Sequence, residues 1–204
     1  QGEGVPIVEN DSYKGYASLE FSGTGSAVLV WQDERFGNGN GVWDEGEPFS
    51  DDNGNGIWDE GELYEELNGV DLFSQRISNQ NGELVVHWST TEEGGKQICN
   101  SLKDQINPRV THLNEFNTII VWADNRTNGL NGNPKNDIYI QFLNELGENL
   151  LSENGMPISE SPDWVKQLPR VKSDGTFAFV VWEDERTSPN WQYASDIFLS
   201  LIHI

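Results

Sequence analysis

The stretch TIIVWADNR, residues 118–126, decides how this sequence folds, because related copies of it occur three times along the chain. The other two copies are AVLVWQDER, residues 27–35, and FAFVVWEDER, residues 177–186, and all three share the pattern V-W-x-D-x-R. Each copy is followed by a segment that opens with Asp and continues with apolar or aromatic residues: DLFSQRIS from Asp71, DIYIQFLN from Asp137 and DIFLSLIHI from Asp196. Such self-similarity predicts repeated supersecondary units that stack on one another.

Each repeat is expected to hold four short strands. The first follows the Pro of QINPRV (105–110) or QLPRV (167–171), as in Arg109–His112. The second ends in Val-Trp, the third begins at the Asp, and the fourth is a Gly-x-x-Ile element, GKQIC (95–99) or GMPIS (155–159). The β-branched and apolar runs Val28–Trp31, Ile119–Trp122 and Phe179–Trp182 predict central strands covered on both faces. We therefore expect an all-β fold of three four-stranded antiparallel units, about residues 11–100, 101–160 and 161–204 of a single domain 1–204, with one short helix at Glu60–Leu67.

The N-terminal segment GVPIV, Gly4–Val8, has the character of a displaced fourth strand, because it resembles GMPIS. The third repeat shows no such element after its third strand, Asp196–Ile204. We expect residues 4–8 to complete the last unit, from the same chain or from a neighbouring subunit. In the second case the contact is heterologous, and it builds a filament or tubule if the rotation does not close.

The first repeat carries an insertion, residues 36–62, that contains NGNG-V/I-WDEGE twice. Its second half fits the calcium loop D-x-N-x-N-G-x-x-D-x-x-E. Calcium is a hard cation that takes six to eight oxygen ligands. The predicted ligands are the side chains of Asp51, Asn53, Asn55, Asp59 and Glu62 and the backbone carbonyl of Ile57. The first half has Phe36 at the first ligand position and offers Asn38, Asn40, the Val42 carbonyl, Asp44 and Glu47, with Asp33 or Glu34 as a substitute carboxylate. We expect bound Ca²⁺ with a structural role.

Composition narrows the classes of partner. The chain has 34 Asp and Glu against 12 Lys and Arg, a formal net charge of −22, which disfavours nucleic acid and anionic membrane surfaces. No apolar run approaches the about 20 residues of a membrane helix. Because the chain opens at Gln1 without a hydrophobic signal, we expect a processed secreted protein, extracellular or at the cell surface. The single cysteine, Cys99, is expected to be buried.

The sequence contains no G-x-S-x-G motif, and His87, His112 and His203 lie in strand patterns. With 34 acidic residues, no carboxylate pair stands out as a glycosidase pair. The repeated pairs Asp33/Arg35, Asp124/Arg126 and Asp184/Arg186 are expected to hold the fold. Each Arg can bind a carboxylate or loop carbonyls, with Asp71, Asp137 and Asp196 as candidate carboxylates. We therefore expect that the chain is not an enzyme.

These repeats resemble the propeller-like V-W-x-D-x-R…D-I-Y repeats of secreted bacterial surface proteins, loosely related to sialidase-type propeller repeats. The insertion resembles the EF-hand-type loops of bacterial extracellular proteins, such as those of dockerins and thrombospondin-type calcium repeats. The resemblance implies propeller-blade-like units. Our leading expectation is a non-enzymatic, calcium-stabilised structural protein that assembles head to tail by strand exchange between Gly4–Val8 and Asp196–Ile204, giving a filament, tubule or surface layer. The alternatives are a monomeric secreted binding module for carbohydrate or protein, a fragment of a larger surface protein, or a propeller glycosidase.

Overall fold

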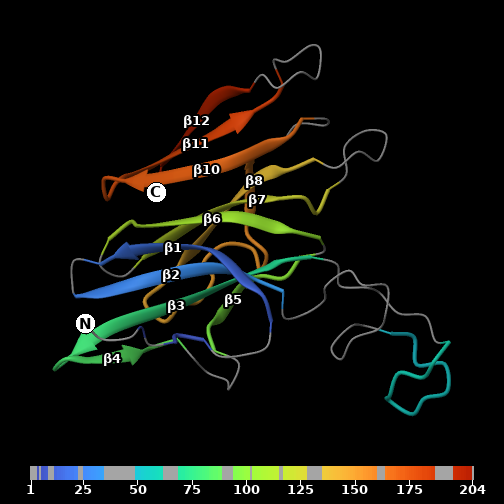
Figure 1. The fold of residues 1–204 in the computed structure, drawn as a ribbon. Coiled ribbons are helices and arrows are strands. Elements are labelled where there is room, and N and C mark those ends of the chain that lie inside the picture. The colour runs from blue at the N-terminus through green and yellow to red at the C-terminus, as the bar shows by residue number, and fades with distance from the viewer. Residues whose placement is uncertain are drawn as a thin grey trace.

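The computed structural model describes residues 4, 6–8, 12–22, 25–34, 49–61, 69–88, 94–101, 103–114, 117–127, 135–159, 164–186 and 195–203. This part of the chain is all β, with antiparallel sheets of three to five strands and no helix (Figure 1). None of its residues therefore forms a helix long and apolar enough to cross a membrane. The short helix expected at Glu60–Leu67 falls largely on residues 62–68, which lie outside the described ranges.

The strands group into three sheets in chain order. The first holds β1 (Lys14–Phe21), β2 (Ser26–Asp33), β3 (Asp71–Gln80), β4 (Glu83–Val86) and β5 (Lys96–Cys99). The second holds β6 (Gln105–His112), β7 (Thr118–Asp124), β8 (Asp137–Leu143) and β9 (Met156–Ser159). The third holds β10 (Lys166–Ser173), β11 (Phe177–Asp184) and β12 (Asp196–His203). The predicted first, second and third strands are all present, and the hairpin strand β4 was not predicted.

The repeated motif sets the same register in every sheet. The Asp that ends the second strand pairs with the Asp that begins the third, as in Asp124↔Asp137 and Asp184↔Asp196. Two residues away, the motif Trp stacks on an aromatic ring of the third strand: Trp31 on Phe73, Trp122 on Tyr139 and Trp182 on Phe198. Residues of the three sheets can therefore be compared position by position.

A β-bulge interrupts the first strand of each sheet at the same place. The residue in the bulge has a positive φ although it is not Gly: 49° at Tyr16, 57° at Asn107 and 51° at Leu168. Pro108 and Pro169 follow directly, at a point where the strand pairing with the next strand is already interrupted. A bulge is one of the few places where a strand tolerates a proline, because no ladder hydrogen bond is lost there.

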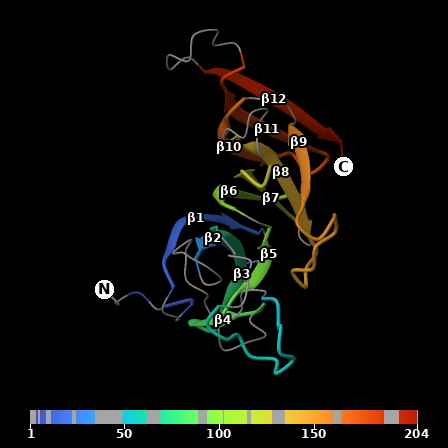
Figure 2. The same cartoon turned by 90° about the vertical axis from the view of Figure 1, so that its right-hand side faces the viewer.

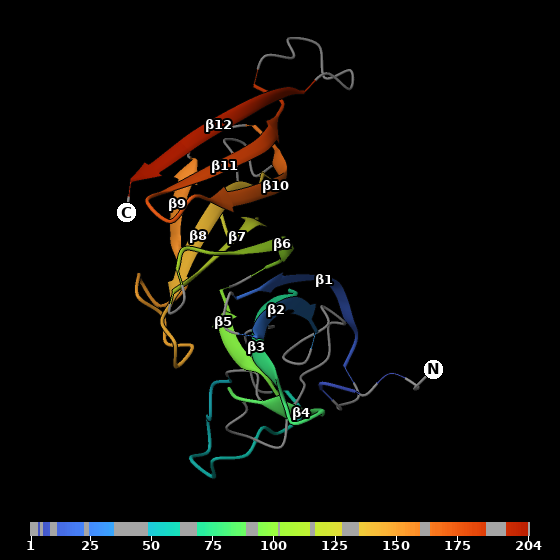
Figure 3. The ribbon, with the colours of Figure 1, turned by 90° about the vertical axis from the view of Figure 1, so that its left-hand side faces the viewer.

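The three sheets lie face to face in chain order, with the second between the other two (Figures 1 and 2). They fan out from their first strands, β1, β6 and β10, and Lys172 of the third sheet reaches Glu20 of the first, with 2.9 Å between Nζ and Oε2. Figure 3 shows the two outer sheets at opposite ends of this fan. The second sheet is consequently covered on both sides, and every residue of β7 is buried.

Alternation along the strands gives each sheet two distinct faces. We call the side that bears the motif Trp the Trp face and the opposite side, which bears the preceding Val, the Val face. The first core cluster joins Val28 and Val30 of the first sheet to Trp122 of the second. The other cluster joins Val121 of the second sheet to Trp182 of the third. Both internal contacts thus pack a Val face onto a Trp face.

Two expectations about the outer parts of the molecule are wrong. Phe179–Trp182 was expected to be covered on both faces, but Phe179 is 42% exposed, because no described residues form a sheet against the Val face of the third sheet. The described residues of Gly4–Val8 form no strand, and Ile7 and Val8 lie against the first sheet, so completion of the last sheet by the same chain is wrong, while completion by a neighbouring subunit stays a prediction. Ile7 and Val8 line a pocket of about 260 Å³ with Leu29 and Trp31, on the Trp face of the first sheet.

Candidate functional site at the third sheet

A glycine that lies against the motif Trp directly precedes β5 in the first sheet and β9 in the second, the strands at the fourth-strand position. Gly95 and Gly155 have φ values of +79° and +77°, in the left-handed region that residues with a Cβ rarely adopt. A Cβ added to Gly95 would lie 2.5 Å from Cη2 of Trp31, and one added to Gly155 would lie 2.3 Å from Cη2 of Trp122. The predicted Gly-x-x-Ile elements are therefore strands β5 and β9, and their glycine is required by the indole that occupies the Cβ position.

The motif Asp fixes that indole. The ring nitrogen of Trp122 donates to Asp124 Oδ2 at 2.8 Å, and that of Trp182 donates to Asp184 Oδ2 at 3.3 Å. Both carboxylates are buried, and each is paired with the Arg two residues further along the chain, Arg126 or Arg186. The expected carboxylate partners are wrong: Arg126 and Arg186 bind the Asp of their own motif rather than Asp137 or Asp196, because the turn after the strand brings them back. The expected loop carbonyl is found at Arg126, which donates to the Asn154 carbonyl at 2.9 Å.

Each arginine also covers the aromatic ring on which the Trp stacks. The guanidinium carbon lies 4.0 Å from the ring centroid of Tyr139 for Arg126, and 4.2 Å from that of Phe198 for Arg186. Burial would raise the pKa of Asp184, but the hydrogen bonds from Arg186 and Trp182 outweigh it and lower that pKa below its ordinary value. The carboxylate in turn raises the pKa of Arg186 through their hydrogen bond. The third sheet thus has the same Trp–Asp–Arg arrangement as the second.

What differs in the third sheet is its outer edge. In the second sheet β9 pairs with β8 through Met156↔Ile140, Pro157↔Tyr139 and Ser159↔Ile138. In the third sheet β12 takes the place of β8 and is the edge strand, since the described residues place no strand beyond it. An edge strand presents backbone N–H and C=O groups that can pair with another strand. The third sheet therefore has a position for a fourth strand beside β12, and no described residues fill it.

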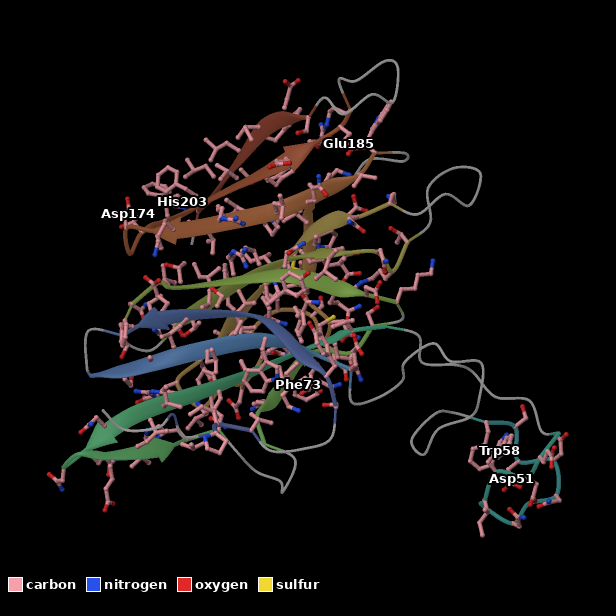
Figure 4. All side chains as sticks on the ribbon, in the orientation of Figure 1. Asp51, Trp58, Phe73, Asp174, Glu185 and His203 are labelled. Carbon is pink, nitrogen blue, oxygen red and sulfur yellow. The ribbon has the colours of Figure 1, made fainter. Side chains whose placement is uncertain are left out.

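The Val face of the third sheet is also uncovered in the described structure (Figure 4). Its large side chains are exposed by 42% at Phe179, 71% at Ile197, 60% at Leu199 and 54% at Leu201. The residues at the first three of these positions in the second sheet, Ile119, Ile138 and Ile140, are at most 3% exposed. Apolar side chains gathered on one face in this way mark interaction sites in soluble proteins. The free edge and the exposed face together form the candidate site.

The described part of the insertion, residues 49–61, folds around two carboxylates away from the sheets (Figure 4). Asp51 accepts three backbone N–H groups of the loop, at 2.7 to 3.0 Å. Asp59 accepts the side-chain N–H groups of Asn53 at 2.6 Å and of Asn55 at 2.7 Å. Gly56 turns the chain with a φ of +74°. The loop brings four of the predicted ligands into one hydrogen-bonded group.

This group fits a hard cation in its donor types. Asp51 and Asp59 carry carboxylate oxygens and Asn53 and Asn55 carry amide oxygens, the ligand types that calcium takes. In this structure the two amide oxygens accept the backbone N–H groups of Asn55 at 3.0 Å and Ile57 at 2.6 Å. Ile57, whose carbonyl is a predicted ligand, lies in the same loop, with its N–H bound to the Asn55 amide oxygen. The remaining predicted ligands lie outside the described residues: Glu62, Asn38, Asn40, Val42, Asp44 and Glu47. Within the described ranges, no group of three or more His, Cys, Asp or Glu is placed to hold a metal.

Two further titratable residues are buried. Cys99 is 1% exposed, as predicted, and burial raises the pKa of its thiol to about 12. Lys166, which the sequence did not single out, is fully buried, with its Nζ 2.7 Å from Asp137 Oδ1. Lys135 also pairs with that carboxylate, at 3.0 Å. The sequence signal for Lys166 is its place opposite the motif Asp184, a position that Lys14 and Gln105 hold in the other sheets.

Comparisons with known proteins concern the fold. No protein-family model and no curated protein sequence matches the chain. Among solved structures, the chain is similar to an α-L-arabinanase of Penicillium chrysogenum complexed with arabinobiose, with a TM-score of 0.44 and 13% identity over 94% of this chain. The chain spans 64% of the length of that protein.

The expectation that the chain is not an enzyme is contradicted by this comparison, because the similar structure is that of an enzyme. The expected absence of activity is therefore withdrawn. At this identity and TM-score, the neighbour assigns no substrate, reaction or catalytic residue to the chain.

Proposed function

We propose that this chain is a β-propeller-like binding module that takes up a polypeptide strand at the free edge of β12. The three sheets are its blades, since they repeat one strand order and fan out from β1, β6 and β10. One observation carries the proposal. The third sheet has Trp182, Asp184 and Arg186 in the same arrangement that lies beside the fourth strand β9 in the second sheet, but the described residues supply no fourth strand to the third sheet.

Strand addition suits this edge physically. The incoming strand gains backbone hydrogen bonds from β12, and pockets for alternate side chains give specificity. The residues equivalent to those that pair with β9 are Ile197, Phe198 and Leu199. Two of them expose large apolar side chains, and burying such a side chain stabilises by about 1.5 to 3 kcal/mol.

Hydrogen exchange followed by mass spectrometry tests this proposal. A synthetic peptide of the fourth-strand type, with the sequence of residues 1–10, is added to the full chain. We expect amide exchange to slow in β12, while exchange in β8, already paired on both sides, stays unchanged. Unchanged exchange in β12 at saturating peptide would contradict strand uptake.

A second candidate function, head-to-tail assembly, is supported by the two outer faces. The Val face of the third sheet exposes the apolar residues described above. At the other end, the Trp face of the first sheet exposes Leu19 by 46% and Phe21 by 76%, whereas the counterparts of Leu19, Val110 and Val171, are buried. The chain already packs a Val face on a Trp face twice, so its two ends are complementary to each other across two copies.

Sedimentation velocity over a range of protein concentrations tests this assembly. We expect wild type to form larger species as concentration rises, and Leu199→Glu to stay monomeric, because the charge would be buried in the contact. Glu83→Gln, an exposed change in β4, is the matched control. A protein that stays monomeric at all concentrations would contradict head-to-tail assembly but would be compatible with uptake of a peptide strand.

For the insertion we propose a structural calcium site built on Asp51, Asn53, Asn55, Asp59 and the Ile57 carbonyl. The support is the convergence of the four side chains and the Gly56 turn. A bound ion stabilises the folded loop by about 2.7 kcal/mol when its concentration is 100 times Kd. Calorimetric titration should show binding to wild type and none to Asp51→Ala; equal binding by both would place the ion elsewhere. Such a site and the net charge of −22 suit the calcium-rich extracellular setting that we also propose.

A further inference from the structure

We infer that the strand accepted by β12 begins with a glycine seated on Trp182, and that Gly4–Val8 of a second copy of the chain supplies it. The inference rests on the proposed strand uptake and names its ligand. It comes from the geometry shared by the first two sheets, where the fourth strand enters over the motif Trp through a glycine.

The requirement for glycine follows from two independent examples. Gly95 and Gly155 share a left-handed φ, and at each the indole of the motif Trp fills the space of a Cβ. Trp182 has the same anchor on Asp184 and the same stacking on Phe198 as its counterparts. A strand that pairs with β12 in the register of β9 must therefore cross Trp182 with a residue that has no Cβ.

The N-terminal segment has the required glycine and matches the sequence around β9 at two further positions. Aligned with β9, Gly4 matches Gly155, Pro6 matches Pro157 and Ile7 matches Ile158. Pro157 shows that the fourth-strand position accepts a proline, since an edge strand does not need that N–H for its ladder.

The isoleucine of this pattern packs on a core cluster in both occupied sheets, fully buried at Ile98 and partly buried at Ile158. Ile98 of β5 belongs to the first core cluster with Leu72, and Ile158 of β9 packs on the second cluster, which contains Ile138. By the same register, Ile7 would pack beside Ile197, which is 71% exposed. The incoming segment would therefore cover the apolar face as well as the edge.

The donor is a second copy because the segment of the same chain lies on the far sheet. Ile7 and Val8 line the pocket on the Trp face of the first sheet, and a Cβ on Gly94 would lie 3.2 Å from Val8 Cγ1. The third sheet is at the other end of the fan (Figure 1). Gly4 itself has open space around its Cβ position. Among the described residues nothing requires a glycine at position 4, and a position against Trp182 of another molecule would require one.

The glycine rule is tested with two labelled peptides of residues 1–10, one of them carrying Gly4→Ala, titrated with the full chain by fluorescence anisotropy. We expect the Ala peptide to bind at least about tenfold more weakly, because the left-handed conformation alone costs a residue with a Cβ about that factor. Trp182→Phe in the chain shortens the ring and should reduce this difference. Equal binding of both peptides would overturn the glycine rule while leaving strand uptake intact, and no binding of either would overturn both.

The identity of the donor is tested by cysteine crosslinking in one variant, Val8→Cys with Ile197→Cys. These positions should face each other, as Ser159 faces Ile138 in the second sheet. We expect intermolecular disulfides, seen as a ladder on non-reducing gels and lost when Gly4→Ala is added. The control pairs Val8→Cys with a cysteine at exposed Ile57. A disulfide within one chain, or equal crosslinking in the control, would overturn the assignment to a second copy.

Discussion

Replacing Gly155 with Ala is the sharpest test of the idea that the motif Trp dictates the start of the fourth strand. Gly155 has a φ of +77°, and the left-handed conformation costs a residue with a Cβ about 1 to 2 kcal/mol. The added methyl would lie 2.3 Å from Cη2 of Trp122 and 2.9 Å from the Ile140 carbonyl oxygen. The ring is fully buried and held by Asp124, so relief requires movement of a packed core, at about 1 to 3 kcal/mol more.

The sum predicts a loss of about 2 to 5 kcal/mol in the free energy of unfolding, measured by urea denaturation followed by tryptophan fluorescence. Gly82→Ala is the matched control: Gly82 also has a positive φ, +92°, but nothing lies within 4 Å of the added Cβ. It should lose only the conformational part, about 1 to 2 kcal/mol. If both variants lose the same amount, the indole does not exclude a side chain, and the glycine rule for the third sheet loses its basis.

Three further predictions concern titratable groups: Lys166, Asp184 with Arg186, and Cys99. Lys166→Ala should destabilise by about 3 kcal/mol, because it leaves the Asp137 carboxylate buried with one partner fewer; a denaturation midpoint equal to wild type would show that Lys135 suffices. The pKa of Asp184 is lowered in the folded state, so its stabilisation is present above about pH 4 and is lost as pH falls through the folded pKa. Arg186→Met should therefore move acid unfolding, followed by circular dichroism, to higher pH, and an unmoved midpoint would contradict the pairing. Cys99, with a pKa of about 12, should resist thiol reagents at pH 8 until the chain unfolds; rapid labelling of native protein would show that its site opens.

The strands could be predicted from the sequence because each repeated residue has a local task. The Asp that opens every third strand pairs with the Asp that closes the second, so Asp137 and Asp196 marked real strand starts. The glycine of GMPIS marked a real strand entry for a reason that the sequence does not show, namely the position of the Trp122 ring. Repetition revealed that these residues matter, and the structure supplied why.

Features that depend on tertiary neighbours were not predictable in the same way. FAFVVW and TIIVW have the same pattern of apolar residues ending in Val-Trp. Phe179 is nevertheless exposed and Ile119 buried, because only the second sheet lies between two others. The arginine partners were missed since the turn that returns Arg126 to Asp124 is not encoded in strand periodicity. The bulge at Asn107 also escaped notice, although Pro108 beside it is the kind of residue that a bulge accommodates.

The exposed apolar residues of β12 are better explained by the repeat than by chance. Ile197 and Leu199 occupy positions that in the second sheet hold Ile138 and Ile140, where burial against the next sheet requires them. Edge strands that meet only water commonly carry charges or prolines that prevent pairing, and β12 carries neither between Ile197 and Ile202. A strand with an intact pairing edge, an apolar face and an anchored Trp182 behind it has the properties of a surface that is covered when the protein works. Which partner covers β12 is therefore the central question, and the Gly4→Ala peptide and the Val8→Cys/Ile197→Cys crosslink test a second copy of the chain as that partner.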